Sequence, residues 1–202
     1  MLIDTHCHLN FEAFNQDIDA VLKRAIEAGV EKIIIPGAKM DSSEKAVEIA
    51  GKYDNCYAAV GLHPHHAQEY DDTAPYHRGN EEVKERLIKL AKNKKVVAVG
   101  ECGLDYFRYE KTVYEKQEMT PETKARQKEL FKIHLEVALE LKLPVIIHCR
   151  EAYEEMFQII TTPSRSPFGH LEGGLKNLRG VFHCFSGTIA DLEKVLAMGF
   201  YI

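Results

Sequence analysis

The sequence lacks the features that would place it among nucleic-acid-coating, membrane or exported proteins. It has no excess of positive charge, because 26 lysines and arginines stand against 31 aspartates and glutamates, for a formal net charge of −5. No stretch approaches the ~18 apolar residues of a membrane helix, and the apolar start, Met1 to Ile3, is too short for a signal peptide. We therefore expect a cytoplasmic protein that makes no use of a membrane and binds any phosphate-bearing substrate locally.

The sequence also lacks the paired cysteines of a disulfide-linked secreted domain. Its five cysteines are odd in number and scattered, which is compatible with a reducing compartment. Four of them come one position after a histidine or glutamate at the end of an expected strand, so alternation along the strand turns them toward outer helices as small buried residues. These four are Cys7, Cys102, Cys149 and Cys184.

What is present is a regular alternation of strands and helices in a chain of 202 residues, 45% hydrophobic and 28% charged, which fits one domain. Apolar, β-branched runs alternate with segments whose apolar residues recur at helical spacing. No internal repeat and no second domain is evident. The expected strands are Leu2–Thr5, Val30–Ile35, Cys56–Val60, Val96–Val99, Pro144–Ile147 and Gly180–Phe182, and "GFYI" at 199–202 begins a seventh.

Three helix starts carry a recognisable cap. Asp41 and Glu44 make a capping-box pattern, Thr120 is followed by a proline suited to the first helical turn, and Thr188 precedes the last apolar helix. Strands that are apolar on both faces and separated by helices predict a parallel sheet covered by helices, either an open doubly wound sheet or a (β/α)8 barrel.

The positions of the polar residues favour the barrel. Five of the six expected strands end in a potential metal ligand, as they do in barrels, where catalytic groups gather at the carboxyl ends of several strands. An open sheet would instead concentrate such groups at one switch point. The strand-end residues are His6 and His8, His63, Glu101, His148 and His183.

These side chains suit a pair of divalent ions. Neutral imidazoles and one carboxylate that converge on a barrel axis match two ions about 3.5–4 Å apart, bridged by the carboxylate and a hydroxide. Glu101 is the natural bridge, and the implied chemistry is metal-assisted hydrolysis. The alternative is a set of hydrogen-bonded polar groups in the core without a metal.

Several motifs together resemble the TatD family of metal-dependent deoxyribonucleases. They are "DTHCHL", "VGLHPH", "VGECGLDY", "PVIIHCR" and "GVFHCFSG", in the family's order and over nearly the whole chain. The resemblance implies a TIM-type barrel and 3′ exonuclease-like hydrolysis of DNA phosphodiesters with two Mg, Mn or Zn ions. Carried over, His6 and His8 bind one ion, His148 and His183 bind the second, and Glu101 binds both.

Further residues receive roles with alternatives left open. His63 and Arg150 are candidates to hold the substrate phosphate, since a guanidinium fork suits phosphate oxygens. Asp105 is expected to orient a metal-binding histidine, with a helix cap or a substitute base as alternatives. "FRYEKTVYEKQ" could stack on single-stranded bases, although a solvated loop is the favoured interpretation. Four other histidines, His65, His66, His77 and His134, are expected to be ordinary surface or helix residues.

One part of the family pattern is missing. The aspartate of a motif like E-T-D-x-P at the end of strand eight has no counterpart, and a full barrel takes about 250 residues. We expect a single TatD-like domain over residues 1–202, truncated at its C-terminus, with six βα units and the start of strand seven. A second copy of the chain that covers the open barrel is the alternative to truncation. Two other functions stay open: hydrolysis of amide or carboxyl-ester bonds, or an inactive fragment that serves for self-association.

Overall fold

The computed structural model describes residues 1–70, 79–112, 118–161, 165–166, 169–170 and 177–202. Among these residues no helix combines the length and the apolar character that a membrane crossing requires. His77 and part of the "FRYEKTVYEKQ" segment lie outside the described residues.

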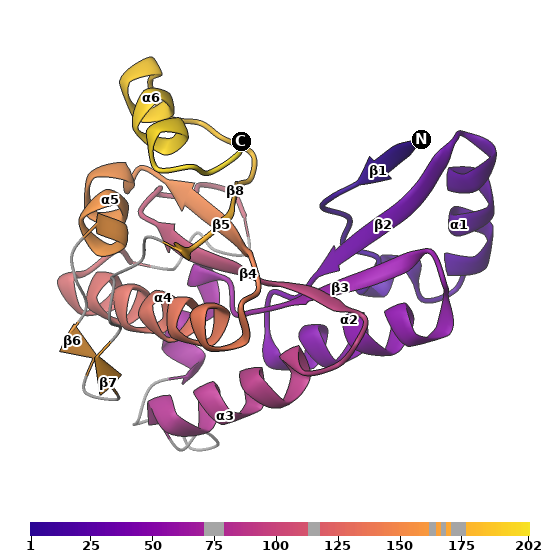
Figure 1. Ribbon diagram of the computed structural model, residues 1–202, viewed down its shortest axis with the longest axis horizontal. Coiled ribbons are helices and arrows are strands. Elements are labelled where there is room, and N and C mark those ends of the chain that lie inside the picture. Colours follow the sequence, from indigo (N-terminus) through magenta and orange to yellow (C-terminus); the bar gives the residue numbers. More distant parts are fainter. Residues whose placement is uncertain (71–78, 113–117, 162–164, 167–168, 171–176) are drawn as a thin grey trace.

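The core of the fold is a curled sheet of six parallel strands (Figure 1). Neighbouring strands in the sheet follow the order β1-β2-β3-β4-β5-β8. Tyr201 adds a single parallel bridge to Val181 of the last strand, where the sequence predicts a seventh strand to begin. The strands are β1 (Leu2–Asp4), β2 (Val30–Pro36), β3 (Cys56–Val60), β4 (Val96–Asp105), β5 (Val145–Arg150) and β8 (Gly180–Phe182).

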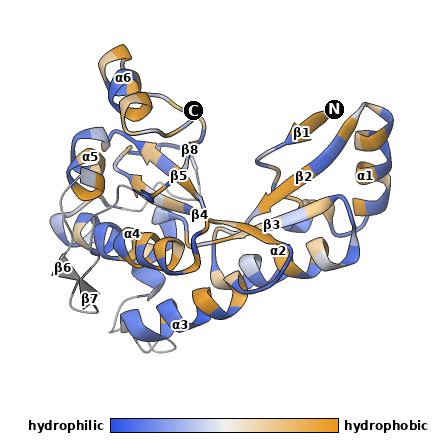
Figure 2. Cartoon of the chain, viewed as in Figure 1, coloured by the Kyte–Doolittle hydropathy of each residue, from blue (hydrophilic) through white to orange (hydrophobic). Residues whose placement is uncertain are grey.

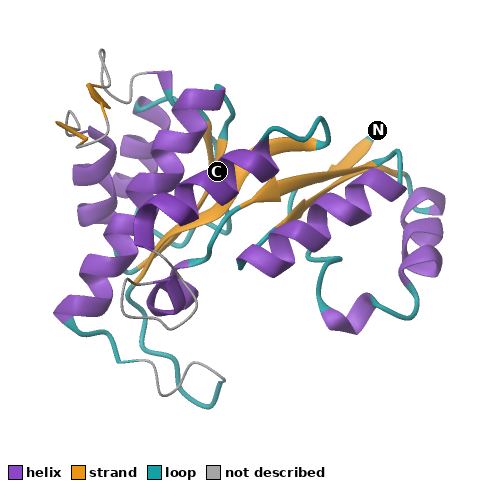
Figure 3. Cartoon of the chain, turned by 90° about the horizontal axis from the view of Figure 1, so that it is seen from below, coloured by secondary structure: helices purple, strands orange, loops and turns teal. Residues whose placement is uncertain are grey.

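Helices join the strands and lie along the outside of the sheet (Figures 1 and 3). A separate two-stranded hairpin, β6 (Arg165–Ser166) and β7 (Gly169–His170), follows the fifth helix. The α-helices are α1 (Ile18–Glu27), α2 (Met40–Lys52), α3 (Gly79–Ala91), α4 (Pro121–Leu141), α5 (Tyr153–Thr161) and α6 (Ile189–Ala197), and two 3-10 helices are η1 (Glu12–Phe14) and η2 (Pro64–Tyr70). This is an α/β half-barrel, which confirms the expected incomplete TIM-type barrel.

Two of the three predicted helix caps are confirmed. The Thr120 hydroxyl accepts a hydrogen bond from the Thr123 N–H, with Pro121 in the first turn, and Thr188 caps α6 in the same way. The third is wrong, because α2 begins at Met40 and Asp41 already lies inside it. Ser42 supplies the bond instead, its Oγ accepting from the Lys39 N–H at 2.8 Å.

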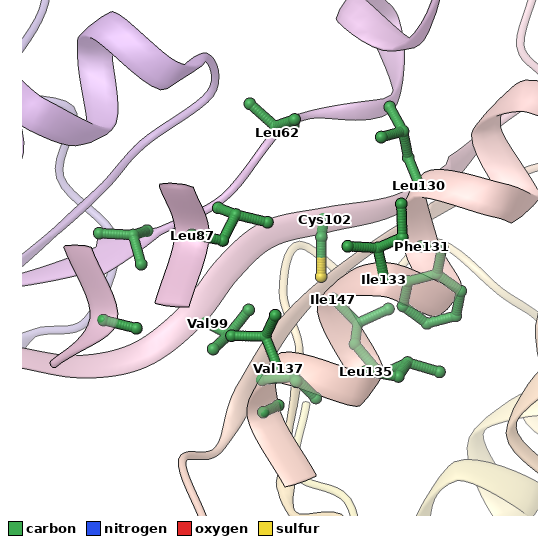
Figure 4. Close-up of a cluster of buried hydrophobic side chains, with 14 of the residues drawn as sticks. Leu62, Leu87, Val99, Cys102, Leu130, Phe131, Ile133, Leu135, Val137 and Ile147 are labelled. Atoms are coloured by element: carbon green, nitrogen blue, oxygen red, sulfur yellow. The ribbon is translucent and has the colours of Figure 1, made fainter. Parts of the chain in front are cut away.

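The sheet separates two layers of apolar side chains. Alternation sends one set outward against the helices, where Leu130, Ile133 and Val137 of α4 meet Ile147 of β5 (Figure 4). Burial of each such side chain contributes roughly 1.5–3 kcal/mol. The other set faces the concave side and forms a smaller cluster of Ile34, Ala59, Ala98, Ile146 and Val181.

The cysteines mostly follow the prediction. Cys102 and Cys149 are buried, Cys102 among the side chains of α4 (Figure 4), and Cys7 is half-buried in the same core. Cys184 is the exception. It is exposed and has a left-handed backbone with φ of 50°, so the strand alternation that would have turned it inward ends before this residue.

The two edges of the curled sheet are apolar and exposed. Leu2 and Ile3 of β1 are 60% and 48% exposed at one edge, and Tyr201 is 75% exposed at the other. Figure 2 shows the apolar colour of β1 at the N-terminus. Parallel strands are normally covered on both faces and at their edges, so these residues form a surface suited to a further chain segment.

Candidate metal centre

The carboxylate of Glu101 lies at the centre of a group of imidazoles. Its Oε2 is 3.2 Å from Nε2 of His6 and 3.6 Å from Nε2 of His8, and these two nitrogens are 3.2 Å apart. Metal–ligand bonds of roughly 2.1 Å place neighbouring donor atoms about 3.0–3.4 Å apart. Two of the three distances match this spacing and the third, from His8 to Glu101, is slightly longer, so the three atoms suit one divalent ion.

The second oxygen of Glu101 faces a different pair of imidazoles. Its Oε1 is 3.0 Å from Nδ1 of His148 and 2.6 Å from Nε2 of His183, and Nε2 of His63 lies 3.6 Å away. The rings of His183 and His6 stack at 4.0 Å, so the two pairs are adjacent. One carboxylate between two pairs of nitrogens is the arrangement that a bridged two-metal site requires.

The electrostatics of the centre favour a cation. The side chain of Glu101 is only 5% exposed. Burial opposes its ionisation, but the surrounding imidazoles of His148, His183, His6 and His8 outweigh burial and hold the pKa of Glu101 well below its ordinary value. A buried anion ringed by nitrogen donors fits a divalent ion. Two separate groups could each hold an ion, because the donor atoms within each lie within 4.8 Å of one another: His6 with Glu101 and His183, and His63 with Asp105 and His148.

A bulge in β4 aims Glu101 at the centre. Val99 pairs with Val145, but Cys102 pairs with Ile147, so β4 carries one extra residue over this step. Ala98 faces the concave side and Val99 faces the helices. Strict alternation would then turn Glu101 toward the helices, and the extra residue reverses this. β4 consequently extends to Asp105, beyond the predicted end at Val99.

Backbone contacts set the tautomers of two rings. Nδ1 of His8 lies 3.2 Å from the Pro36 carbonyl, to which it must donate, so its Nε2 presents a lone pair to the centre. His63 has the opposite pattern, because its Nδ1 accepts from the His65 N–H at 3.2 Å. The neutral ring of His63 therefore carries its proton on Nε2, where it can donate to an anionic ligand.

Asp105 connects the centre to the neighbouring loops. Its Oδ2 accepts hydrogen bonds from His148 Nε2 at 2.8 Å and from the Tyr109 hydroxyl at 2.7 Å, and His65 Nε2 lies 3.0 Å away. Its Oδ1 accepts from the Phe107 N–H. Burial opposes ionisation, yet these donors hold the pKa of Asp105 far below its ordinary value. The same carboxylate, together with Glu101, outweighs burial of His148 and raises the pKa of His148 to about 9.

Arg150 lies on the rim, held by aromatic side chains. Its guanidinium sits 3.9 Å from the centre of the Phe107 ring, and Nη1 donates to the Tyr109 hydroxyl at 3.2 Å. These contacts fix the orientation of the guanidinium. They leave its positive charge in place, because an aromatic ring face attracts a cation without neutralising it. Tyr109, which belongs to the "FRYEKTVYEKQ" segment, thus joins Arg150 to Asp105.

Three of the histidines that were expected to be ordinary surface or helix residues lie in the described part of the chain, and two of them support the centre. The side chain of His65 is only 7% exposed and meets Asp105, and its position in "GLHPHH" two residues after His63 was the available signal. His66 conforms more closely to expectation, since it pairs with the exposed Glu69 at 2.7 Å. His134 is a helix residue of α4, which agrees with one of the two expected environments, but it is fully buried.

His134 holds the loop that carries His63. Its Nε2 accepts from the Leu62 N–H at 2.9 Å, and its Nδ1 donates to the Leu130 carbonyl at 2.6 Å. Burial lowers the pKa of His134 to about 4. Helical spacing alone could not indicate this role, because the partner of His134 lies on a loop 72 residues away.

His134 should make the stability of the fold pH-dependent. Between the ordinary pKa near 6.5 and the folded value near 4, the unfolded chain binds a proton that the folded chain excludes. The free energy of unfolding should therefore fall by about 3 kcal/mol from this group as the pH drops through that window. His134→Gln should lose this slope in urea unfolding measured between pH 4 and 7, and an unchanged slope would contradict the assignment.

Curated proteins that are similar in sequence to the chain include nucleases. It is 34% identical to the 3′-5′ ssDNA/RNA exonuclease TatD of Shigella flexneri over 202 residues, which is all of the chain and 66% of that protein. It is 36% identical to the exonuclease of the same name from Erwinia tasmaniensis, again over 66% of its length. It is 34% identical to an uncharacterized metal-dependent hydrolase of Bacillus subtilis, over 68% of its length. The chain thus spans about two thirds of these relatives.

Solved structures agree with this placement. A TatD homologue from Escherichia coli superposes with a TM-score of 0.75 at 31% identity, covering 98% of the chain and 66% of the homologue. A TatD family hydrolase from Entamoeba histolytica gives 0.74 at 27% identity, with 98% and 63% covered. The family model described as TatD related DNase matches residues 3–202. Glu101 and the converging imidazoles thus lie in a chain that belongs to the family of TatD related DNases.

Proposed function

We propose that the chain is a metal-dependent hydrolase of the TatD type that cleaves phosphodiester bonds of single-stranded DNA as a 3′ exonuclease. The observation that carries the proposal is the buried carboxylate of Glu101, whose two oxygens each face a pair of imidazole nitrogens. Relatives named as exonucleases and as a metal-dependent hydrolase support the same class of reaction.

The ligands divide between two ions. His6 and His8 would hold one and His148 and His183 the other, with Glu101 shared between them. Two Mg, Mn or Zn ions in these positions would polarise a phosphoryl oxygen and supply the attacking oxygen at neutral pH. Glu101 would be shared by the two ions, and its pKa, held well below the ordinary value by the surrounding imidazoles, keeps it ionised at neutral pH.

His63 and Arg150 would bind the substrate phosphate. The tautomer of His63 places a donor N–H toward the centre, which suits a phosphate oxygen better than a cation. The guanidinium of Arg150 is held over Phe107 with its donor groups available for a bidentate contact. Both residues would orient the scissile phosphate while the ions bind its other oxygens.

Asp105 would orient the metal ligand His148 and would not contact the substrate. Its carboxylate accepts from His148 Nε2, which fixes the ring so that Nδ1 points at the centre. With its hydrogen bonds from Tyr109 and the Phe107 N–H as well, Asp105 has little capacity left for a metal. This pattern is typical of a carboxylate behind a metal-binding histidine.

We propose further that residues 1–202 act as one cytoplasmic domain, and that a second copy can cover the open edge. The support for a second copy is the exposure of Leu2 and Ile3 on the unpaired side of β1. A mass in solution of twice 23.0 kDa would support it, and a monomer would contradict it.

The function is tested with single-stranded DNA labelled at its 5′ end. Metal-loaded protein should release mononucleotides from the 3′ end and leave a ladder of shortened products, and EDTA should stop the reaction. His148→Ala removes a ligand of one ion and should lower the rate by about 1000-fold or more, since metal ions contribute several kcal/mol of transition-state stabilisation. A wild-type rate no higher than that of His148→Ala would reject the proposal.

A further inference from the structure

One large apolar side chain beside the centre is exposed. The ring of Phe11 is 48% exposed, although the two residues before it, Leu9 and Asn10, are buried. Phe11 lies flat on the imidazole of His8, with the ring centres 4.5 Å apart and the planes inclined by 12°. An aromatic ring that stacks in this way on a ligand of the centre lies within reach of a bound substrate.

The loop that carries Phe11 is firmly held. The side-chain amide of Asn10 donates to the Pro36 and Ser42 carbonyls, both at 2.9 Å. The Phe11 N–H donates to the His8 carbonyl at 3.1 Å, and the Phe11 carbonyl accepts from the Phe14 N–H at 3.1 Å. The ring is thus presented in a fixed orientation, so little conformational entropy would be lost when a ligand stacks on it.

Phe11 is separated from the centre by one imidazole ring. The ring it covers belongs to His8, whose Nε2 is 3.6 Å from Glu101, and Arg150 lies at the end of β5. A phosphate at the centre carries its base one sugar away, and bases stack on aromatic rings irrespective of sequence. An exonuclease that accepts any base needs a contact of this type.

We propose that Phe11 is a stacking platform for the base of the nucleotide whose phosphate occupies the centre. The inference rests on the proposed function, because it takes the ligand to be a nucleotide. Phe11 would add a contact to the base, whereas His63 and Arg150 would contact only the phosphate.

The test compares two ligands that a phosphodiesterase cannot cleave further. In calorimetric titrations with Mn²⁺ present, the wild type should bind thymidine 5′-monophosphate about tenfold more tightly than 2-deoxyribose 5-phosphate, which lacks a base. Phe11→Leu keeps an apolar side chain but loses the aromatic face, and should abolish this preference. Phe11→Tyr should retain it. Ile26→Ala, which removes an exposed apolar side chain from α1, is the matched control and should bind as the wild type does.

The outcomes separate the inference from the function. Equal binding of both ligands by the wild type, absence of binding by both, or an unchanged preference in Phe11→Leu would overturn the stacking role, whether or not the protein hydrolyses DNA. Loss of preference in Phe11→Leu alone supports the platform. If that loss occurs in a protein without exonuclease activity, the platform stands and the proposed reaction fails.

Discussion

Replacement of Glu101 by glutamine is expected to lower the affinity for divalent ions by more than about 100-fold and to abolish hydrolysis of DNA. Loss of an outer partner of a metal ligand already costs roughly 10- to 100-fold in affinity, and Glu101 contacts both pairs of imidazoles directly. Glutamine has the same shape but no charge, and only its amide oxygen, not its amide nitrogen, can bind a metal ion. Elemental analysis after dialysis, together with titration by Mn²⁺ or Zn²⁺, measures the loss.

Glu155→Gln provides the matched control for this variant. Glu155 is also bonded to neighbouring side chains, Lys128 and Tyr106, but lies outside the centre. It should bind metal as the wild type does. A Glu101→Gln protein that folds normally and retains two ions with unchanged affinity would show that Glu101 does not bridge them.

Replacement of Gly103 by alanine is expected to lower the free energy of unfolding by about 3 kcal/mol or more. Gly103 pairs with His148 in the register of β4 and β5, and a Cβ on Gly103 would overlap the His148 carbonyl oxygen. Its φ of +147° is also one that other residues rarely adopt. Because the obstacle is backbone in the middle of the sheet, relief requires the two strands to separate. That separation would move His148 away from Glu101, so metal affinity should fall as well.

Gly51→Ala is the control for this substitution, because a Cβ there meets nothing within 4 Å and Gly51 lies in α2. It should stabilise the fold by about 0.5–1 kcal/mol, the usual gain from alanine in a helix. Urea unfolding of both variants gives the comparison. Equal stability of Gly103→Ala and the wild type would mean that β4 and β5 do not approach as closely as the structure indicates.

The sequence was informative wherever local pattern controls structure. Strand runs such as Cys56–Val60 and Gly180–Phe182 were predicted to the residue, because a buried parallel strand is a continuous apolar run with helical segments on both sides. The positions of His6 and His8, and of His148, followed from the same reasoning, since alternation and strand ends are local properties.

The bulge at Glu101 was beyond such reasoning. Nothing in "VGECGLD" indicates that β4 carries an extra residue against β5. Alternation counted from Ala98 and Val99 without that residue would turn the carboxylate toward the helices. The sequence placed Glu101 beside its partners through its position at the end of an expected strand and through the family motif, neither of which indicates a bulge. The reversal of facing depends on how Val99 and Cys102 pair with another strand.

The sequence by itself determined the order of strands and helices and the side chains available for a metal centre, because both are set by residues close together in the chain. The tertiary structure decided which way Glu101 points, that His134 is buried behind Leu62, and that His65 and Tyr109 meet at Asp105. These contacts join residues up to 72 positions apart. They arise only when strands pair and helices pack, because burial and hydrogen bonding then act between segments that the linear pattern keeps separate.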